Sequence, residues 1–587
     1  MADENKDNQP DQEPVPPLNE ETPSQAVRQY AAKKKKHFRR LRQLLSTKKG
    51  KVVAILLVIV IAAGVLYAIP ATRYGILGQF IKRDASFVVM DSATKKPVTQ
   101  ATVTIGELEA KTDNKGRVTI GDVPVGEYMA TIKKTHYEER TIPYTIPIFG
   151  NTSELTVDLE ARGRQVSLSV VNLITKAALA KAELTVGEAS VITDSEGKAT
   201  IVLPTDQPTQ KGTLKLDGYN AADVQITVTD QADANMLAMT PAGSVFYLSK
   251  ATGKINVMKS NLDGTNAKTI VEATGSESDN ETVLLAARDW KYLALFAKRD
   301  SSKKGQLFLV NAQTGKLSVI DEGVTATFQP VGWSNHRFLY LVDRDKQPWE
   351  DKQRALKSFD ADTGKTEVLD ETQGYGTSHT HYQREYLNDA YIVGDAVAYA
   401  KVWSSNGYGS MASKKSTIVS MKADGGQKQT LKEFTAENFI NISARVYEPK
   451  SVIYAVNIDG AGVSYYEYEN GKIEPTSSTS DKFFAQYPTY LVSPDNEMTL
   501  WSEPRNGKTA VLVGDSEGKN EKTLANESDY AAYGWYSDQY VLVSKNGSEL
   551  YIAPKEAAFD TVQPLKITNY HKPALTYPGY GYGYGGI

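Results

Sequence analysis

Histidine is the first residue type to examine for chemistry in this chain. Six histidines are present, and only His379 and His381 lie close together. In a strand, residues i and i+2 point to the same side, so these two imidazoles could share a metal ion such as zinc. No third ligand is identifiable from the sequence, and exposed loop histidines are the commoner explanation. The sequence therefore leaves a metal site as unknown.

Cysteine and the common catalytic motifs are missing from the sequence. No cysteine is present, which excludes disulfides, thiolate metal sites and cysteine nucleophiles. The stretch 407–412 lacks the second glycine of a Gly-x-Ser-x-Gly elbow, and no phosphate-binding glycine loop occurs. Carboxylates are plentiful, so a glycosidase pair stays open, but no spacing nominates one. We therefore assign no catalytic residue, no cofactor-binding residue and no cofactor.

Two acidic turns invite a calcium interpretation. Asp113 and Asp194 each begin a short turn that ends in glycine. A calcium site needs six to eight oxygen ligands, and each turn offers a single carboxylate. A structural role in the turn is the main interpretation, because aspartate bonds the local backbone and glycine supplies a positive φ.

An uncharged apolar run extends from Val52 to Thr72, and the candidate residues discussed above all lie after it. A helix of this length spans a bilayer core of roughly 30 Å, which predicts a transmembrane helix over 51–72. Eleven Lys and Arg and no acid lie between residues 25 and 51. Residues 1–50 are therefore expected to be a disordered, basic cytoplasmic tail, and the rest extracytoplasmic. A cleaved signal peptide is the alternative, but its charged region would be unusually long.

Two segments after the apolar run share one pattern at an offset of 81 residues. The matched positions are Asp91 with Asn172, the apolar alternation of 101–105 with that of 182–186, and Thr112–Gly116 with Thr193–Gly197. A register held across about 25 residues indicates a tandem repeat of roughly 80 residues. The alternation of apolar residues and the tight turns predict β-structure in both copies.

The first copy resembles the carboxypeptidase regulatory-like and PEGA group of β-sandwich domains. The motif runs through Thr94, Pro97 and Val98, then the turn at 112–116, then Val123-Pro-x-Gly-x-Tyr128. The second copy departs from it, with Ala178 in place of the proline and Gly212-Thr-Leu214 in place of Gly-x-Tyr. The resemblance implies two β-sandwiches, over 84–160 and 163–235, that act as spacers or binding modules. It implies no peptidase activity.

A looser repeat occupies residues 240–570. Its unit is a strand, a short glycine-containing turn and a second strand, beginning at Ile255, Gln306, Ala355, Thr417, Ser464, Ala510 and Glu549. Most spacings are near the about 40–50 residues of a four-stranded propeller blade. With cues such as Gly332-Trp-Ser-Asn and Gly534-Trp-Tyr-Ser-Asp, the pattern is similar to TolB-type β-propellers. The resemblance implies about seven blades, with six or eight as alternatives.

Two further segments stand apart from this repeat. Gly374–His381 lengthens one interval and is expected to form a long loop on one face. Residues 571–587 are rich in Tyr and Gly and are expected to form a flexible tail that buries no core.

The sequence thus predicts a mainly β, single-pass bacterial cell-membrane protein with its N-terminus in the cytoplasm. After residue 51 the chain holds fewer Lys and Arg than Asp and Glu, which argues against nucleic acid as a partner. We expect a surface binding, adhesion or scaffold protein, not an enzyme, with the bilayer and an unidentified surface protein, peptide or glycan as partners. The alternatives are an extracytoplasmic hydrolase or lyase with its site at the propeller channel, and a transmembrane sensor.

Overall fold

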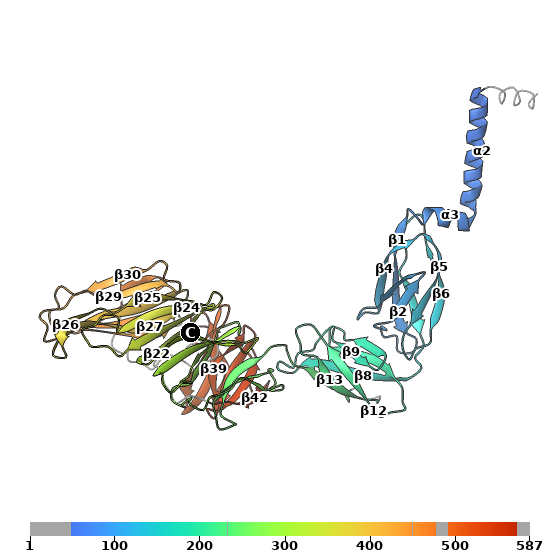
Figure 1. The fold of residues 1–587 in the computed structure, drawn as a ribbon. Coiled ribbons are helices and arrows are strands. Elements are labelled where there is room, and N and C mark those ends of the chain that lie inside the picture. Colours follow the sequence, from blue (N-terminus) through green and yellow to red (C-terminus); the bar gives the residue numbers. More distant parts are fainter. Residues whose placement is uncertain (1–47, 230, 232, 449, 477–490, 572–587) are drawn as a thin grey trace, which may run out of the picture. The chain divides into compact units, whose positions relative to one another are not determined.

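The structure is a computed structural model that describes residues 48–571 except 230, 232, 449 and 477–490. The predicted tails cover 1–50 and 571–587, and residues 1–47 and 572–587 of them lie outside the described residues. The chain divides into two compact units (Figure 1). One extends to Lys134 and includes Glu138–Glu160, and the other holds Thr135–Tyr137 and all residues from Ala161 onward. The predicted mainly β fold is confirmed, because strands make up most of the regular secondary structure in the described residues.

Two helices precede the first strand. The longer helix, α2, covers Lys48–Ala68, and α3 covers Pro70–Leu77. Ile69 between them is extended, and Pro70 begins α3, where its missing N–H costs no helical hydrogen bond. Figure 1 shows α3 lying across the axis of α2. Among the described residues, no helix combines the length and the hydropathy that crossing a membrane requires, so the predicted span over 51–72 is not confirmed.

The first β-domain has two sheets. One sheet has β1 (Lys82–Asp91) in its centre, antiparallel to β4 (Arg117–Pro124) and parallel to β7 (Leu155–Leu159). The other has the order β3 (Leu108–Lys111), β2 (Thr102–Ile105), β5 (Gly126–Lys133), β6 (Arg140–Ile146). Phe87 of β1 packs on Tyr144 of β6 with ring centroids 4.6 Å apart, which joins the two sheets in one core.

The second β-domain repeats this arrangement. Its three-stranded sheet has β8 (Arg164–Asn172) between β11 (Lys198–Leu203) and the parallel strand β14 (Met236–Met239). Its four-stranded sheet has the order β10 (Ala189–Ile192), β9 (Glu183–Val186), β12 (Thr209–Lys215), β13 (Ala222–Thr227). Residues of both sheets form one buried cluster. The closing strand β14 lies beyond residue 235, where the sequence placed the domain end.

The same turn contacts recur 81 residues apart. Asp113 accepts hydrogen bonds from the backbone N–H groups of Lys115 and Arg117, both at 2.8 Å. Asp194 accepts from Glu196 and Lys198 in the same way, at 2.9 Å. Each carboxylate therefore stabilises its own turn, which is the structural role that the sequence favoured over calcium.

Asn172 replaces the aspartate of the first copy and makes an additional contact. Its Oδ1 accepts hydrogen bonds from the N–H groups of Ile174 and Thr175, as Asp91 Oδ1 does from Ala93 and Thr94. Its Nδ2 also donates to the Tyr540 hydroxyl of the propeller at 3.0 Å. An aspartate has no N–H to donate, so at this position it could only accept a hydrogen bond from the Tyr540 hydroxyl.

Seven sheets follow in chain order. Sheet 1 has β15 (Val245–Ser249), β16 (Asn256–Ser260) and β17 (Lys268–Val271); sheet 2 has β18 (Val283–Ala286), β19 (Tyr292–Phe296), β20 (Gly305–Asn311) and β21 (Leu317–Gly323); sheet 3 has β22 (Ala326–Ser334), β23 (Arg337–Arg344), β24 (Arg354–Asp360) and β25 (Lys365–Glu371). Sheet 4 has β26 (Gly374–Ser378), β27 (His381–Val393), β28 (Ala396–Asn406), β29 (Ser416–Lys422) and β30 (Gln429–Phe434). Sheet 5 has β31 (Ile440–Glu448), β32 (Ser451–Ile458), β33 (Val463–Glu469) and β34 (Lys472–Pro475); sheet 6 has β35 (Leu491–Val492), β36 (Met498–Arg505), β37 (Lys508–Asp515) and β38 (Lys522–Ser528); sheet 7 has β39 (Tyr530–Ser537), β40 (Tyr540–Lys545), β41 (Glu549–Pro554) and β42 (Leu565–Asn569).

The sheets pack into a ring that closes on itself. Buried clusters join each sheet to the next from sheet 1 to sheet 5, and sheet 6 to sheet 7. Leu542 and Ile552 of sheet 7 share a cluster with Val245 and Leu248 of sheet 1, which brings the last sheet against the first. Radial repetition of such sheets, with the last sheet against the first, is the arrangement of a β-propeller.

Buried polar bonds cross between neighbouring sheets. The indole Nε1 of Trp333 in β22 donates to the Leu285 carbonyl of β18 at 3.0 Å, and Trp535 in β39 donates to Leu491 of β35 at 2.7 Å. These are the tryptophans of the two Gly-Trp cues. Asp321, on the outer strand of sheet 2, accepts from the Tyr340 hydroxyl of sheet 3 at 3.0 Å.

The segment Gly374–His381 differs from the predicted long loop. Residues 374–378 form β26, which pairs with β27 and adds a fifth strand to sheet 4. The register shifts between Gly376 and Ser378, and a Cβ on Gly376 would lie 2.4 Å from the His381 carbonyl oxygen. The glycines that suggested a loop instead permit a bulged hairpin.

Replacing Trp333 with Phe should destabilise the propeller by about 1–3 kcal/mol, because the buried Leu285 carbonyl loses its donor. Trp333→Ala should cost about 3–5 kcal/mol, since it also leaves a cavity. Tryptophan fluorescence during urea unfolding measures this, because all six tryptophans lie between residues 290 and 535. The control is Trp349→Phe at a half-buried position; an equal loss in this control would contradict the argument.

Candidate functional site

One edge of the ring gathers charged side chains, and we call it the turn face. Two kinds of turn from sheets 2 and 3 lie on this face. One kind joins the first strand of a sheet to the second, and the other joins the third strand to the fourth. In sheet 2 the first of these turns spans 287–291, between β18 and β19; in sheet 3 it is Asn335–His336, between β22 and β23. The other turn of sheet 3 spans 361–364, between β24 and β25.

His336 lies at the centre of a cluster that spans sheets 2 and 3. Its Nε2 is 2.8 Å from Asp289 Oδ2, and its Nδ1 is 2.8 Å from Asp362 Oδ2. Lys291 Nζ lies 3.0 Å from Asp289, and the Tyr292 hydroxyl donates to Asp362 at 3.0 Å. We call these five residues the His336 cluster.

The charges of the His336 cluster support one another. Burial disfavours the imidazolium, but hydrogen bonds and charge from Asp289 and Asp362 outweigh this effect and raise the pKa of His336 above its ordinary value. The hydrogen bond from His336 is the main cause that lowers the pKa of Asp362. Burial of Asp289 acts in the opposite direction, yet its bonds to His336 and Lys291 still lower its pKa.

An unusual backbone conformation holds Asp289 in place. The next residue, Trp290, has a φ of 61°, in the left-handed region that large side chains rarely adopt. The Trp290 indole donates to the Tyr536 carbonyl at 2.8 Å, and its ring lies 5.4 Å from the Tyr536 ring. These contacts with sheet 7 stabilise the strained turn.

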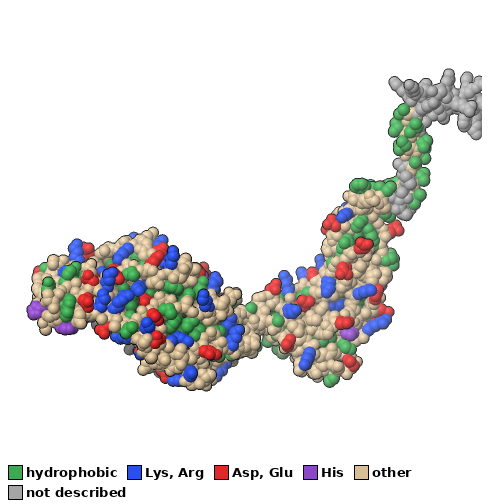
Figure 2. Space-filling model, in the orientation of Figure 1, with side chains coloured by type: hydrophobic (Ala, Val, Ile, Leu, Met, Phe, Trp, Pro, Cys, Tyr) green, Lys and Arg blue, Asp and Glu red, His purple; other side chains and the backbone are tan. Residues whose placement is uncertain are grey.

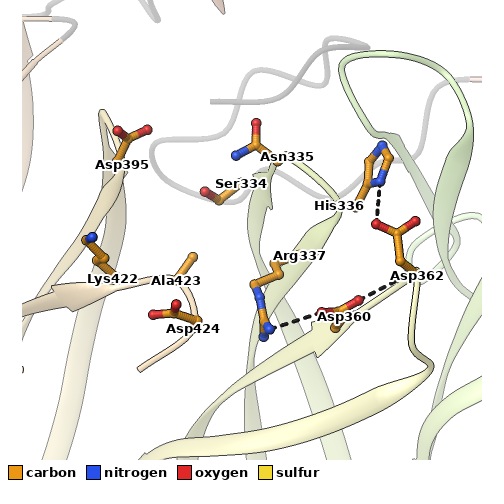
Figure 3. Close-up of a pocket in the computed structure, with 10 residues that line it drawn as sticks. All are labelled: Ser334, Asn335, His336, Arg337, Asp360, Asp362, Asp395, Lys422, Ala423 and Asp424. Carbon is orange, nitrogen blue, oxygen red and sulfur yellow. Dashed lines mark hydrogen bonds and ion pairs between the residues drawn. The ribbon is translucent and has the colours of Figure 1, made fainter. Parts of the chain in front are cut away.

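A cavity of about 650 Å³ opens beside the His336 cluster. Figure 3 shows its walls: Ser334, Asn335, His336, Arg337, Asp360 and Asp362 come from sheet 3, and Asp395, Lys422, Ala423 and Asp424 come from sheet 4. Arg337 is bound to Asp360 at 3.0 Å. Four carboxylates therefore face only two permanent cations, so the cavity has an excess of negative charge at neutral pH.

A second cavity, of about 570 Å³, lies on the other side of Asp289. Phe246, Trp290 and Tyr536 form its aromatic part, and Lys259 and Arg288 supply positive charge. Arg288 Nη1 donates to the side chain of Asn496 in the turn between β35 and β36. The turn face thus presents an acidic cavity and an aromatic, more basic cavity next to each other.

The geometry of His336 limits its chemistry. A general base needs a ring nitrogen with a free lone pair, and both nitrogens of His336 face carboxylates. The raised pKa keeps both nitrogens protonated over a wider pH range. The cluster is therefore suited to holding charge and fixing turns, and not to taking a proton from a substrate.

The structure does not bring His379 and His381 together as metal ligands. His379 lies in the turn between β26 and β27 and both histidines are exposed, as the commoner explanation expected, so the two do not share one strand. His379 packs edge-on against Trp349 at 5.1 Å, and His381 Nδ1 is 3.1 Å from the Thr380 hydroxyl. Among the described residues, no group of three or more histidines, cysteines and carboxylates is arranged to hold a metal ion.

The His336 cluster was not identifiable from the sequence. Asp289, His336 and Asp362 are separated by 47 and 26 residues along the chain. Their only shared signal is position, since each follows the end of a strand in the propeller repeat. Superposing the blade repeats would have placed them at one edge, but not in contact.

Comparisons with known proteins assign no family to this chain. No family model matches the chain, and no curated protein matches it. Among solved structures, TolB from Acinetobacter baumannii is 12% identical, with 53% of this chain and 75% of TolB covered and a TM-score of 0.26. The propeller domain of the Trilobed protease from Pyrococcus furiosus is 12% identical, with 63% and 97% covered and a TM-score of 0.31. An oligogalacturonate lyase in complex with manganese is 13% identical, with 53% and 86% covered and a TM-score of 0.26. All three TM-scores lie below 0.5, and the propeller assignment rests on the order and packing of the sheets described above.

The stabilising effect of His336 should depend on pH. Its pKa is raised in the folded chain, so its contribution is complete below its unfolded pKa of about 6.5 and is lost as the pH rises through the folded pKa. Both carboxylates have lowered pKa values, so their contribution is lost only in stronger acid. His336→Gln should therefore lower the propeller Tm by about 2 °C near pH 5.5 and have little effect above pH 9.

The matched control is His571→Gln. Burial lowers the pKa of His571, so this residue favours its neutral form and gains no stability in acid. Differential scanning calorimetry from pH 5 to 9 separates the two variants. An effect of His336→Gln that grows with rising pH would contradict the assigned charge state.

Proposed function

We propose that this chain is a membrane-anchored, extracytoplasmic binding protein whose propeller holds a cationic segment of a partner in the acidic cavity of the turn face. The two β-domains act as the spacer between anchor and propeller. The observation that carries the proposal is the excess of carboxylates around the cavity shared by sheets 3 and 4.

Two carboxylates of the cavity are available to a ligand. Asp395 and Asp424 are both exposed and lie on the sheet 4 wall in Figure 3. Asp424 uses Oδ1 to accept the Gly426 N–H at 2.8 Å, which fixes its side chain and leaves Oδ2 toward solvent. Lys or Arg side chains, or an amino terminus, are the groups that such carboxylates bind best.

The engaged state of His336 argues against this residue as a catalytic acid or base. Hydrolysis and lyase chemistry both need a residue that gives or takes a proton. His336 is not free for this role, because both of its ring nitrogens are bonded to the carboxylates of Asp289 and Asp362. The sensor alternative depends on residues 1–47, which lie outside the described residues.

The anchor part of the proposal rests on α2. The described aliphatic side chains around this helix are more than half exposed, including Val52, Leu57, Ile59, Val60 and Val65. A soluble helix buries such residues on at least one side. In the sequence, no charged residue occurs from Val52 to Thr72, so a lipid environment would satisfy the whole helix surface.

Binding of labelled hexalysine tests the ligand proposal. The Asp395→Asn/Asp424→Asn double variant should weaken binding about fivefold at low salt, because two of the four carboxylates that line the cavity are removed. Fluorescence anisotropy of hexalysine and of hexaglutamate measures this. Glu469→Gln, an exposed carboxylate outside the cavity, is the control. Equal affinities for hexalysine in the double variant and the control would contradict the proposal.

Charges placed in α2 test the anchor. Ile59→Arg/Val60→Arg should move the chain from the membrane pellet to the soluble fraction after a carbonate wash, because each central arginine costs about 2.5–3.5 kcal/mol in a bilayer. Ile59→Leu/Val60→Leu is the control and should stay in the pellet. An unaltered chain in the soluble fraction would rule out the anchor.

A further inference from the structure

The end of the first β-domain next to the helices carries an exposed apolar surface. Phe80 is 80% exposed and Phe149 is 78% exposed. Ile76 of α3 is 53% exposed. Single exposed apolar residues are ordinary, but several at one end of a small domain indicate a contact surface. Figure 2 shows hydrophobic side chains gathered at this end, beside α3.

Hydrogen bonds hold this end in a fixed arrangement. The Phe80 N–H donates to the Leu77 carbonyl at 3.0 Å, which ties it to the end of α3. Arg83 Nη2 donates to the Ile148 carbonyl at 2.8 Å, so the loop with Phe149 lies beside the start of β1. The Val125 N–H donates to the Ile81 carbonyl at 3.1 Å and adds the β4–β5 turn to the same end.

Residues typical of a membrane interface lie at the joint between α2 and α3. The Arg73 guanidinium is 4.7 Å from the centre of the Tyr74 ring and 5.7 Å from that of Tyr67. Tyrosine and arginine pairs of this kind are enriched at the level of lipid headgroups, where a ring meets both apolar chains and water. Lys82, also exposed, adds a positive charge at the same end.

We propose that α3 and the domain end bearing Phe80 and Phe149 rest in the headgroup layer of the bilayer that holds α2. This inference rests on the anchor of the proposed function. A helix that crosses a bilayer upright places α3, which lies across it, in the plane of the membrane surface (Figure 1). Phe80 and Phe149 then insert at the boundary between headgroups and acyl chains, and Arg73 and Lys82 contact lipid phosphates. The first domain thereby stands on the membrane in one orientation.

The absence of native cysteine allows a direct test. Single cysteines replace Gln79 and Asn151, which are exposed and flank the two phenylalanines, and carry an environment-sensitive fluorophore. The full chain is placed in liposomes of phosphatidylcholine and phosphatidylglycerol. Quenching is measured with iodide in water and with nitroxide attached to the lipid. Ile59→Cys reports on α2, and Lys115→Cys, in the turn at the other end of the domain, reports on water.

The labels at 79 and 151 should be quenched by the lipid nitroxide and be about threefold less accessible to iodide than the label at 115. Adding Phe80→Ser and Phe149→Ser should return both to the level of the label at 115.

Three results would overturn the proposal. Iodide access at 79 and 151 equal to that at 115, with Ile59 quenched by lipid, would reject the surface contact and keep the anchor. Protection from iodide without lipid quenching would mean that protein, such as a second copy of this chain, covers the surface. Free access of iodide to Ile59 would reject the anchor and the surface contact together.

Discussion

Neighbouring sheets of the propeller are held in register by buried polar bonds, and the turn face depends on them. An aspartate on the outer strand of one sheet accepts a hydrogen bond from a tyrosine of the next, as Asp321 does from Tyr340 and Asp370 does from Tyr399. Burial opposes the charge of Asp370, but the Tyr399 hydrogen bond and the Lys401 charge outweigh it and lower the pKa of Asp370. Lysines pair with the same aspartates, Lys357 with Asp321 and Lys401 with Asp370, so sheets 2, 3 and 4 have a strong preference for one position beside one another.

The His336 cluster is built on that fixed spacing. Asp289 belongs to sheet 2, and His336 and Asp362 belong to two different turns of sheet 3. Bonds of 2.8 Å on both sides of one imidazole require all three turns to hold their positions closely. The turn face therefore brings together charged residues that are far apart in the sequence. The shape of its acidic cavity is set by the packing of sheet 3 against sheet 4.

The sequence predicted the order of the elements better than their contacts. Glycine turns and alternating apolar residues located most propeller strands, because both signals are local. The two Gly-Trp cues were also recognisable, but not their role, since the acceptor of the Trp333 indole lies 48 residues earlier. The segment 374–381 was misjudged because its glycines serve a bulge in a hairpin. The pairing of His336 with two carboxylates could not be predicted, since it depends on the angle between sheets.

The parallel pairing of β1 with β7, and of β8 with β14, has a mechanical consequence. In each β-domain the chain enters through the first of these strands and leaves through the second. Five residue pairs, from Phe87–Leu155 to Asp91–Leu159, join β1 and β7. Tension applied to the two ends of such a domain pulls parallel neighbours along their length in opposite directions. The hydrogen bonds between them then bear the load together in shear and do not open one after another, a geometry that resists force between a fixed base and a tethered load.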